Sequence, residues 1–262
     1  MSESEHDQRD LASRRAFMKT STAVAAVGIL AACGVKPAAA APMAAQAVPD
    51  VLDVLTVGTL TQEARDAMTP DQIVEKFKEG NARFREGKKT RRDFLAEQRA
   101  TAAGQFPMAV LLSCIDSRAP AEILLNLGIG DVFNCRLAGN VENDDILGSM
   151  EFTTKLAGAK VVLVMGHSAC GAVAGAIADA KLGNLTQLLA KIRPAIAATE
   201  YAGDRSAGNA AFVDAVARKN VELTVAGIRK RSAVIADLEK ARAVKIVGSF
   251  YDIATGAVDF LA

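Results

Sequence analysis

The stretches that decide the fold are residues 108–118, MAVLLSCIDSR, and residues 161–171, VVLVMGHSACG. Each begins with a short apolar run, which is typical of a strand buried on both faces of a parallel sheet. Each run ends just before side chains that can bind metal: Cys114 in the first stretch, His167 and Cys170 in the second. Because open α/β sheets bind ligands beyond the carboxyl ends of their strands, we expect these side chains to meet there.

Two thiols and one imidazole are a donor set that binds zinc, and three protein ligands leave a fourth position for water. The alternative is that the cysteines are small buried hydrophobic residues, as free cysteines commonly are. The presence of both motifs, each directly after a strand, favours the zinc site. Cys135 lies in the strand-like run DVFNCRL with no partner at a ligand spacing, and we interpret it as core packing.

The first motif places three functional side chains at alternate positions, Cys114, Asp116 and Arg118. On an extended chain these side chains point to the same side. Arg118 can then hold Asp116 in a bidentate pair that keeps the carboxylate ionised. Asp116 is therefore expected to accept a proton or a hydrogen bond from water on the metal.

The second motif separates His167 and Cys170 by three positions. Ser168 is a candidate N-cap, and one turn of the helix that it begins would bring the two ligands to the same side. The only other histidine is His6, in a segment that we expect to be removed. The remaining protein cannot build a zinc site of three histidines and has no further histidine to shuttle protons.

Both motifs resemble the zinc motifs of the β-class carbonic anhydrases, at residues 114–118 and 167–171. The resemblance covers about residues 69–262, and it implies an α/β fold in which helices flank a mainly parallel central sheet. Further segments that are similar to the family are 80–84, 130–133, 136–140 and 251–258.

The resemblance also implies roles for single residues and one zinc ion per subunit. These are the zinc ligands Cys114, His167 and Cys170, the catalytic dyad Asp116 and Arg118, and the substrate-binding residues Gln105, Phe133 and Gly171. The implied reaction is the reversible hydration of CO2 to bicarbonate and a proton by zinc-bound hydroxide, since zinc lowers the pKa of bound water from about 15.7 to near 7. The alternatives are hydrolysis of CS2 or COS at the same zinc, and a non-catalytic structural zinc module.

A subgroup of the family carries an inhibitory bicarbonate site that needs a tryptophan three residues before the first cysteine. Leu111 stands there in this chain, although Arg136 matches the arginine of that site. We therefore expect movement of Asp116 onto the zinc to be weak or absent. Phe152 stands where some members carry a tyrosine. Two thiolates donate more charge to zinc than imidazoles, so we expect activity to rise above neutral pH.

The N-terminal segment has the features of an export signal. Residues 13–19, SRRAFMK, match the twin-arginine pattern, and the apolar stretch 23–32 is too short to span a membrane but fits a signal peptide. Residues 30–33, LAAC, resemble a lipoprotein cleavage box in which Cys33 would carry a lipid. Alternatively, residues 45–47, AQA, resemble an ordinary cleavage site.

These features divide the chain into a signal peptide (1–33), a linker (34–68) and a zinc-dependent domain (69–262). We expect a periplasmic protein, anchored by lipid at Cys33 in the lipoprotein case. The net charge of +1 gives no indication of a nucleic-acid partner. With Cys33 lipidated and two cysteines on zinc, only Cys135 remains, so we expect no disulfide.

The rest of the chain alternates helices and strands, which also predicts an α/β fold. Thr69, Pro70 and Gln72 have the pattern of a helix start. A helix opened by Asp145 is expected to turn Phe152 toward the core. Further helices are expected at 91–103, 185–198 and 212–238, and strands at 244–251 and 256–261.

The resemblance implies a homodimer as the minimal unit, with the pocket at the subunit interface. In that case the apolar face of the helix at 69–87, formed by Ile73, Phe77 and Phe84, would pack on the partner. The alternative is that this face covers the core of its own chain.

Overall fold

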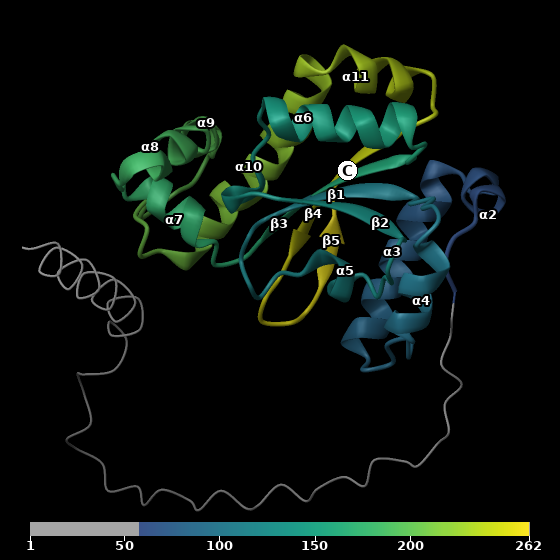
Figure 1. Ribbon diagram of the computed structural model, residues 1–262. Coiled ribbons are helices and arrows are strands. Elements are labelled where there is room, and N and C mark those ends of the chain that lie inside the picture. Colours follow the sequence, from purple (N-terminus) through teal and green to yellow (C-terminus); the bar gives the residue numbers. More distant parts are fainter. Residues whose placement is uncertain (1–57, 262) are drawn as a thin grey trace, which may run out of the picture. The chain divides into compact units, whose positions relative to one another are not determined.

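The structure, a computed structural model, describes residues 58–261, which form a five-stranded sheet with helices on both faces (Figure 1). The strands lie in the order β2-β1-β3-β4-β5, and every neighbouring pair except β4 and β5 is parallel. Their bounds are Ala109–Ser113 (β1), Val132–Arg136 (β2), Val161–His167 (β3), Lys245–Tyr251 (β4) and Val258–Phe260 (β5). The prediction of an α/β fold with a mainly parallel central sheet is confirmed.

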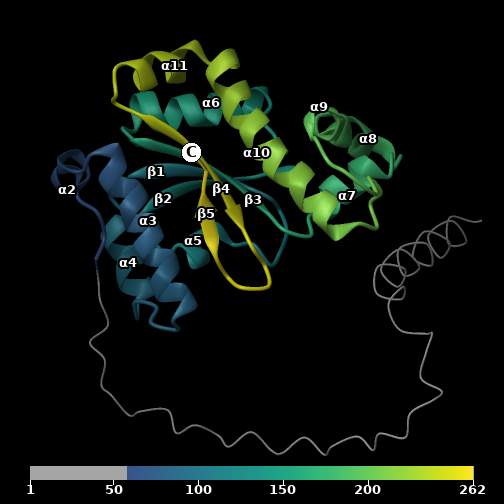
Figure 2. The ribbon, with the colours of Figure 1, turned by 180° about the vertical axis from the view of Figure 1, so that it is seen from behind.

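Helices cover both faces of this sheet, as Figures 1 and 2 show from opposite sides. α3 and α5 pack on one face, with α4 beside α3, and α6, α10 and α11 pack on the other face. α7, α8 and α9 lie beyond the carboxyl end of β3. Their bounds are Pro70–Arg85 (α3), Phe94–Thr101 (α4), Ala121–Leu124 (α5), Asp144–Glu151 (α6), Gly171–Ile177 (α7), Gly183–Ala190 (α8), Arg193–Ala198 (α9), Ala210–Arg231 (α10) and Ala233–Lys240 (α11).

The apolar run of β1 packs against helices on both sides of the sheet. Ala109 and Leu111 belong to the core under α3 and α5, whereas Val110 and Leu112 belong to the core under α6, α10 and α11. All four side chains are fully buried. Burial on both faces explains why the central strands are continuous apolar runs and do not alternate with polar residues.

Capping residues set the start of the first predicted helices. Thr69 and Gln72 form a capping box at the start of α3, as predicted. The helix expected at 91–103 begins later, at Phe94, because the side chain of Asp93 caps it. A capping side chain accepts a backbone N–H that has no partner within the helix, and it therefore defines the first turn.

Two predicted helices are each divided in the structure. In the segment 212–238, Ser232 ends α10, and its hydroxyl accepts from Ile235 N–H at 3.1 Å to begin α11. In the segment 185–198, Pro194 lies in the first turn of α9. Because proline has no N–H, it cannot continue the hydrogen bonds of α8, and a new helix begins.

Phe152 does not face the core, contrary to the prediction, and it is 55% exposed. At this residue α6 gives way to a π-helical segment, η2 (Phe152–Leu156). The wider turn of a π-helix changes which side chains face inward. Thr153 and Thr154 are buried instead, and their hydroxyls donate to Met150 O at 2.9 and 2.8 Å.

The folded part extends further toward the N-terminus than the predicted boundary at residue 69. A helix, α2 (Gln62–Ala67), lies within the expected linker, and Leu60 and Met68 pack against the core. The expected signal peptide, including Cys33, lies outside the described residues. In the part of the chain that the structure describes, no helix is both long and apolar enough to cross a bilayer.

The apolar face of α3 covers the core of its own chain. Ile73 and Phe77 are fully buried in that core, and Phe84 packs against it while partly exposed. For Ile73 and Phe77 the prediction of packing on a partner is therefore wrong, and the alternative that they cover the core of their own chain is correct.

Candidate metal centre

Three side chains that can bind a metal meet at the carboxyl edge of the sheet. Cys114 follows β1 directly, His167 is the last residue of β3, and Cys170 precedes α7. β1 and β3 are neighbours, with Ser113 beside Met165 in the register. The two sulfur atoms and a ring nitrogen of the histidine lie within 4.8 Å of one another, and all three residues are buried. The prediction that the two motifs converge is confirmed.

The second motif reaches the site through a tight turn. Ser168 does not cap a helix, contrary to the prediction: its N–H donates to Tyr251 O and its hydroxyl accepts from Ile253 N–H, both at 2.9 Å. Ala169 then adopts a left-handed backbone conformation (φ 53°), and Cys170 is the N-cap residue of α7. Ser168 thus extends the pairing of β3 with β4, and the turn at Ala169 returns Cys170 to the end of β3.

His167 is oriented to bind a metal through Nε2. Its Nδ1 lies 2.9 Å from Ser168 O, so the hydrogen-bond network assigns the proton to Nδ1. Nε2 is buried and has no hydrogen-bond partner among the described residues. An unpaired buried nitrogen beside two sulfur atoms is unfavourable unless a cation binds there. Two sulfur donors and one nitrogen donor fit zinc.

The segment after β2 holds the first motif in place. Arg136 Nε donates to Cys114 O at 2.9 Å, and its Nη2 donates to Asp116 O at 2.6 Å. Gly139 N–H donates to Cys114 Sγ at 3.3 Å from a 3-10 turn, η1 (Ala138–Asn140). Contrary to the prediction, the motif is not extended over its whole length, because the chain turns at Ser117 and Arg118. Arg136, which matches an arginine of the family's inhibitory bicarbonate site, donates here to the backbone of the zinc motif.

Asp116 and Arg118 form the bidentate pair that the sequence predicts. Arg118 Nε donates to Asp116 Oδ1 at 3.0 Å, and its Nη2 donates to Oδ2 at 2.8 Å. This guanidinium holds the pKa of Asp116 at about 2, below its ordinary value. Asp116 Oδ2 also lies 4.0 Å from His167 Nε2. The carboxylate is therefore ionised at physiological pH and lies beside the metal ligands.

The two thiols differ in acidity because they share one buried space. The hydrogen bond with Cys170 is the largest cause that lowers the pKa of Cys114, to about 4, and His167 and Gly139 N–H act in the same direction. The pKa of Cys170 is raised above its ordinary value, because its thiol hydrogen-bonds to Cys114, is buried, and would place a second thiolate beside the first. A cation that binds both sulfur atoms must displace this proton, so metal binding weakens as the pH falls.

The three substrate-binding residues implied by the resemblance lie in different places. Gly171 is the exposed first residue of α7, next to Cys170. Gln105 is exposed before β1, and the whole of that strand separates it from Cys114. Phe133 is the second residue of β2, two positions before the residue that pairs with Leu112. Within one chain, the structure brings only Gly171 to the metal centre.

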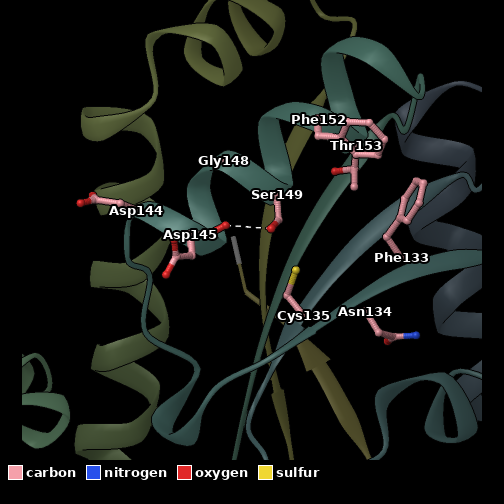
Figure 3. Close-up of a pocket in the computed structure, with 9 residues that line it drawn as sticks. All are labelled: Phe133, Asn134, Cys135, Asp144, Asp145, Gly148, Ser149, Phe152 and Thr153. Carbon is pink, nitrogen blue, oxygen red and sulfur yellow. Dashed lines mark hydrogen bonds between the residues drawn. The ribbon is translucent and has the colours of Figure 1, made fainter. Parts of the chain in front are cut away.

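Phe133 lines a separate pocket of about 660 Å³ between β2 and α6, which we call the β2–α6 pocket (Figure 3). The rings of Phe133 and Phe152 meet edge to face there, with centroids 6.5 Å apart. Cys135 lines the same pocket and is only half buried, so its predicted role in core packing is correct in part. Burial raises the pKa of the Cys135 thiol, which is therefore protonated at neutral pH.

Two residues of α10 contact segments around the zinc ligands, Asp214 the second zinc motif and Asn220 the η1 turn, and both were missed in the sequence. Asn220 Nδ2 donates to Gly139 O at 2.7 Å, and Asp214 Oδ1 accepts from Ala169 N–H at 2.8 Å. An asparagine within the apolar pattern of a predicted helix is a signal for Asn220, since buried polar side chains need specific partners. Asp214 is only partly buried and gives no comparable signal in the sequence.

Comparison with known proteins identifies the family. The family model described as carbonic anhydrase matches residues 109–258. The chain is 34% identical to a carbonic anhydrase of Mycolicibacterium smegmatis, covering 70% of this chain and 89% of that one. It is 35% identical to carbonic anhydrase 2 of Mycobacterium tuberculosis, covering 69% and 87%. The chain therefore belongs to the carbonic anhydrase family.

Solved structures identify the class within that family. The β-carbonic anhydrase CafA of Aspergillus fumigatus is similar with a TM-score of 0.57 and 26% identity, covering 73% of this chain and 89% of that one. A β-carbonic anhydrase of Sordaria macrospora has a TM-score of 0.56 and 26% identity, covering 63% and 85%. The protein is a zinc enzyme of the β class, and its reaction is the reversible hydration of CO2 to bicarbonate.

Proposed function

We propose that Asp116 and Arg118 are the catalytic residues of this carbonic anhydrase, and that Cys114, His167 and Cys170 hold its zinc. Zinc bound there supplies a Lewis acid that makes hydroxide available from water near neutral pH. The observation that carries the proposal is the bidentate pair beside the ligands, with Asp116 Oδ2 4.0 Å from His167 Nε2.

The two residues of the dyad have different tasks. Asp116 accepts a hydrogen bond from the reacting water and orients it, because its carboxylate is an ionised acceptor beside the metal ligands. Arg118 keeps this carboxylate ionised and fixes its direction through two parallel hydrogen bonds. Arg118 Nη2 also donates to Ala169 O at 3.3 Å, which joins the dyad to the second zinc motif.

Stopped-flow CO2 hydration by the zinc-loaded protein at alkaline pH tests this assignment. The Asp116→Ala variant is expected to lose about 10²–10⁴-fold in rate while it retains zinc, as is usual when an acid–base group is removed. An unchanged rate would contradict the catalytic role of Asp116. Absence of CO2 hydration by the wild type, with zinc bound, would instead favour CS2 or COS hydrolysis or a structural zinc module.

We further propose a homodimer in which each chain supplies Gln105 and Phe133 to the zinc site of its partner. These residues lie away from the zinc ligands of their own chain. Phe152 and Leu156 of η2 are 55% and 77% exposed next to the edge strand β2. Exposed apolar side chains beside a sheet edge favour cover by another chain. The β-carbonic anhydrases of Sordaria macrospora are tetrameric, which supports assembly of this chain too.

Mixing two inactive variants tests the shared site. Asp116→Ala disables the metal half of a site, and Gln105→Ala disables the substrate half. In a mixed dimer with two-fold symmetry, one site carries both defects and the other carries none. Subunit exchange is therefore expected to restore about a quarter of the wild-type activity. No restoration, although exchange of subunits is demonstrated, would contradict the shared site.

We also propose that the chain is exported through its twin-arginine signal and resides in the periplasm with a lipid on Cys33. The pattern at residues 13–19 and the Leu-Ala-Ala-Cys sequence at 30–33 support this proposal. Mass spectrometry of the mature protein is expected to find an N-terminal lipidated Cys33. An N-terminus after Ala47 would contradict the anchor, and an uncleaved cytoplasmic protein would contradict export.

A further inference from the structure

The helix α10 contacts Gly166 and Ala169, which precede His167 and Cys170, and it contacts the η1 turn, which donates a hydrogen bond to Cys114. Three of its positions, Asp214, Ala217 and Val221, are three and four residues apart and therefore lie along one side of the helix. Asn220 lies beside Val221 on the same helix and is 3% exposed. A single helix thus contacts the second zinc motif and the turn whose Gly139 N–H donates to Cys114.

The contact near Cys114 is made by Asn220. Its amide donates to Gly139 O at 2.7 Å, and the N–H of the same glycine donates to Cys114 Sγ at 3.3 Å. Gly139 has a positive φ of 71°, and a side chain at this position would meet Ile192 at 2.6 Å. The turn is therefore tightly confined, and the Asn220 amide fixes the direction of the N–H that reaches the sulfur atom.

The contact near Cys170 is made by Asp214. Its Oδ1 accepts from Ala169 N–H at 2.8 Å, while Ala169 O accepts from Arg118 at 3.3 Å. Ala169 has a positive φ of 53°, which is unfavourable for a residue with a side chain. The hydrogen bonds at both ends of this residue stabilise the turn between the second and third ligands.

The contact near His167 is steric. A Cβ atom at Gly166 would meet Val221 Cγ2 at 2.6 Å and Ala217 O at 3.5 Å. α10 therefore lies directly against β3 at the residue before His167. This close approach fixes the distance between the helix and the end of the strand.

We propose that Asp214 and Asn220 are positioning residues of the zinc site, through which α10 holds the second zinc motif and the η1 turn, and by way of this turn Cys114, at a fixed separation. Asn220 also aligns the Gly139 N–H with Cys114, and this hydrogen bond lowers the charge that the sulfur atom donates to the metal. The inference rests on zinc binding by Cys114, His167 and Cys170. It assigns no chemical step to either residue of α10.

Two variants and two controls test the inference in the full-length protein. Asn220→Leu removes the donor at similar volume, and Asp214→Ala removes the acceptor. Asp214→Asn retains an oxygen that can accept from Ala169 N–H, so it is the conservative control. Val225→Ala weakens the packing of the same helix in the core under α6 and α11, and it controls for general destabilisation.

The readouts are transfer of zinc to a chelator and the sulfur-to-cobalt charge-transfer band of the cobalt-substituted protein. Asn220→Leu and Asp214→Ala are expected to release zinc about 10–100-fold faster than the wild type, as is typical when partners of metal ligands are lost. In Asn220→Leu the band is expected to move to longer wavelength, since the sulfur atom loses a hydrogen bond. Asp214→Asn and Val225→Ala are expected to resemble the wild type in both readouts.

The inference is overturned if Asn220→Leu and Asp214→Ala release zinc as slowly as Val225→Ala does. Asp214→Ala decides the outcome if Asn220→Leu does not fold, which circular dichroism would detect. A wild type that binds neither zinc nor cobalt would overturn the metal centre itself. If the wild type binds metal and hydrates CO2 normally, and the variants release zinc no faster than their controls, only the role of α10 is overturned.

Discussion

The metal centre and the β2–α6 pocket differ in how completely one chain builds them. In the metal centre, Cys114, His167 and Cys170 are buried, and hydrogen bonds within the same chain hold their segments. In the pocket, Phe152 is 55% exposed, and Phe133 lies away from the ligands. We therefore expect that one chain suffices to bind zinc, whereas the β2–α6 pocket is completed by the second chain of the proposed dimer.

The largest expected effect, from Cys114→Ser, tests the completeness of the metal centre. Loss of one thiolate leaves two protein ligands, so zinc content and CO2 hydration are expected to fall to background. Cys135→Ser is the matched change in the β2–α6 pocket and is expected to retain its zinc. Elemental analysis after gel filtration measures both. If Cys114→Ser retained zinc and Cys135→Ser lost it, the assignment of the metal centre to Cys114 would be contradicted.

The next effect, from Phe152→Glu, tests whether the pocket depends on a partner. A charge within the exposed apolar patch that the proposed dimer would cover is expected to dissociate the dimer and to lower the rate of CO2 hydration about 10–100-fold. Zinc should stay bound, because the ligands belong to one chain. Light scattering gives the mass of the assembly.

Phe94→Glu is the control for this variant. Phe94 is 57% exposed, but it lies on α4 and not in the β2–α6 pocket. Its replacement is expected to leave both the mass and the rate unchanged. A Phe152→Glu variant that stays dimeric and fully active would show that the pocket does not lie at the interface.

A smaller effect, the pH dependence of the rate of CO2 hydration, distinguishes ionisation of water on the metal from ionisation of Asp116. Since Arg118 holds the pKa of Asp116 at about 2, this carboxylate is ionised throughout the neutral and alkaline range. The rate should nevertheless rise above pH 7, up to about tenfold per unit, because two thiolates weaken the acidity that zinc confers on water. A pH–rate profile that is flat from acid to alkali would contradict this.

The lowered pKa of Asp116 also determines in which direction the free energy of unfolding changes in acid. The folded-state pKa of Asp116 lies below its ordinary value of 3.8, so its contribution to stability is present above pH 3.8. That contribution is lost as the pH falls toward 2. Denaturant unfolding of the wild type and of Asp116→Asn is measured at several pH values between these limits. The difference between their free energies of unfolding should shrink as the pH falls.

The smallest effect is expected outside both regions, where Glu239 of α11 pairs with Arg229 of α10 at 2.8 Å. Arg229 lowers the pKa of Glu239, so this stabilisation is present above pH 4.5 and declines as the pH falls. Glu239→Gln is expected to cost about 0.5 kcal/mol at pH 7, as partly exposed ion pairs do. Urea unfolding at two pH values measures it, and a larger loss in acid would contradict the assignment.

The metal centre could be predicted from the sequence because each ligand lies next to the strand that positions it. Cys114 follows one apolar run and His167 ends another, so the topology of a parallel sheet brings them together. The bidentate pair of Asp116 and Arg118 was equally local, being two positions apart. These features depend on few contacts with the rest of the chain.

Features that depend on distant contacts could not be predicted. Ser168 has the sequence of a helix cap, but its N–H bonds to Tyr251 and its hydroxyl to Ile253, and both bonds extend the sheet. The exposure of Phe152 results from one π-helical turn that no local pattern indicates. Asn220 acquires its partner, Gly139, only when α10 packs on the sheet.

The most direct test of the central claim is the zinc K-edge absorption spectrum of the protein as isolated. The site is expected to show two sulfur scatterers at about 2.3 Å and two nitrogen or oxygen scatterers at about 2.0–2.1 Å. One of the latter is His167, and the other is exchangeable. A first shell with no sulfur, or with more than two sulfur atoms, would contradict a metal centre built from Cys114, His167 and Cys170.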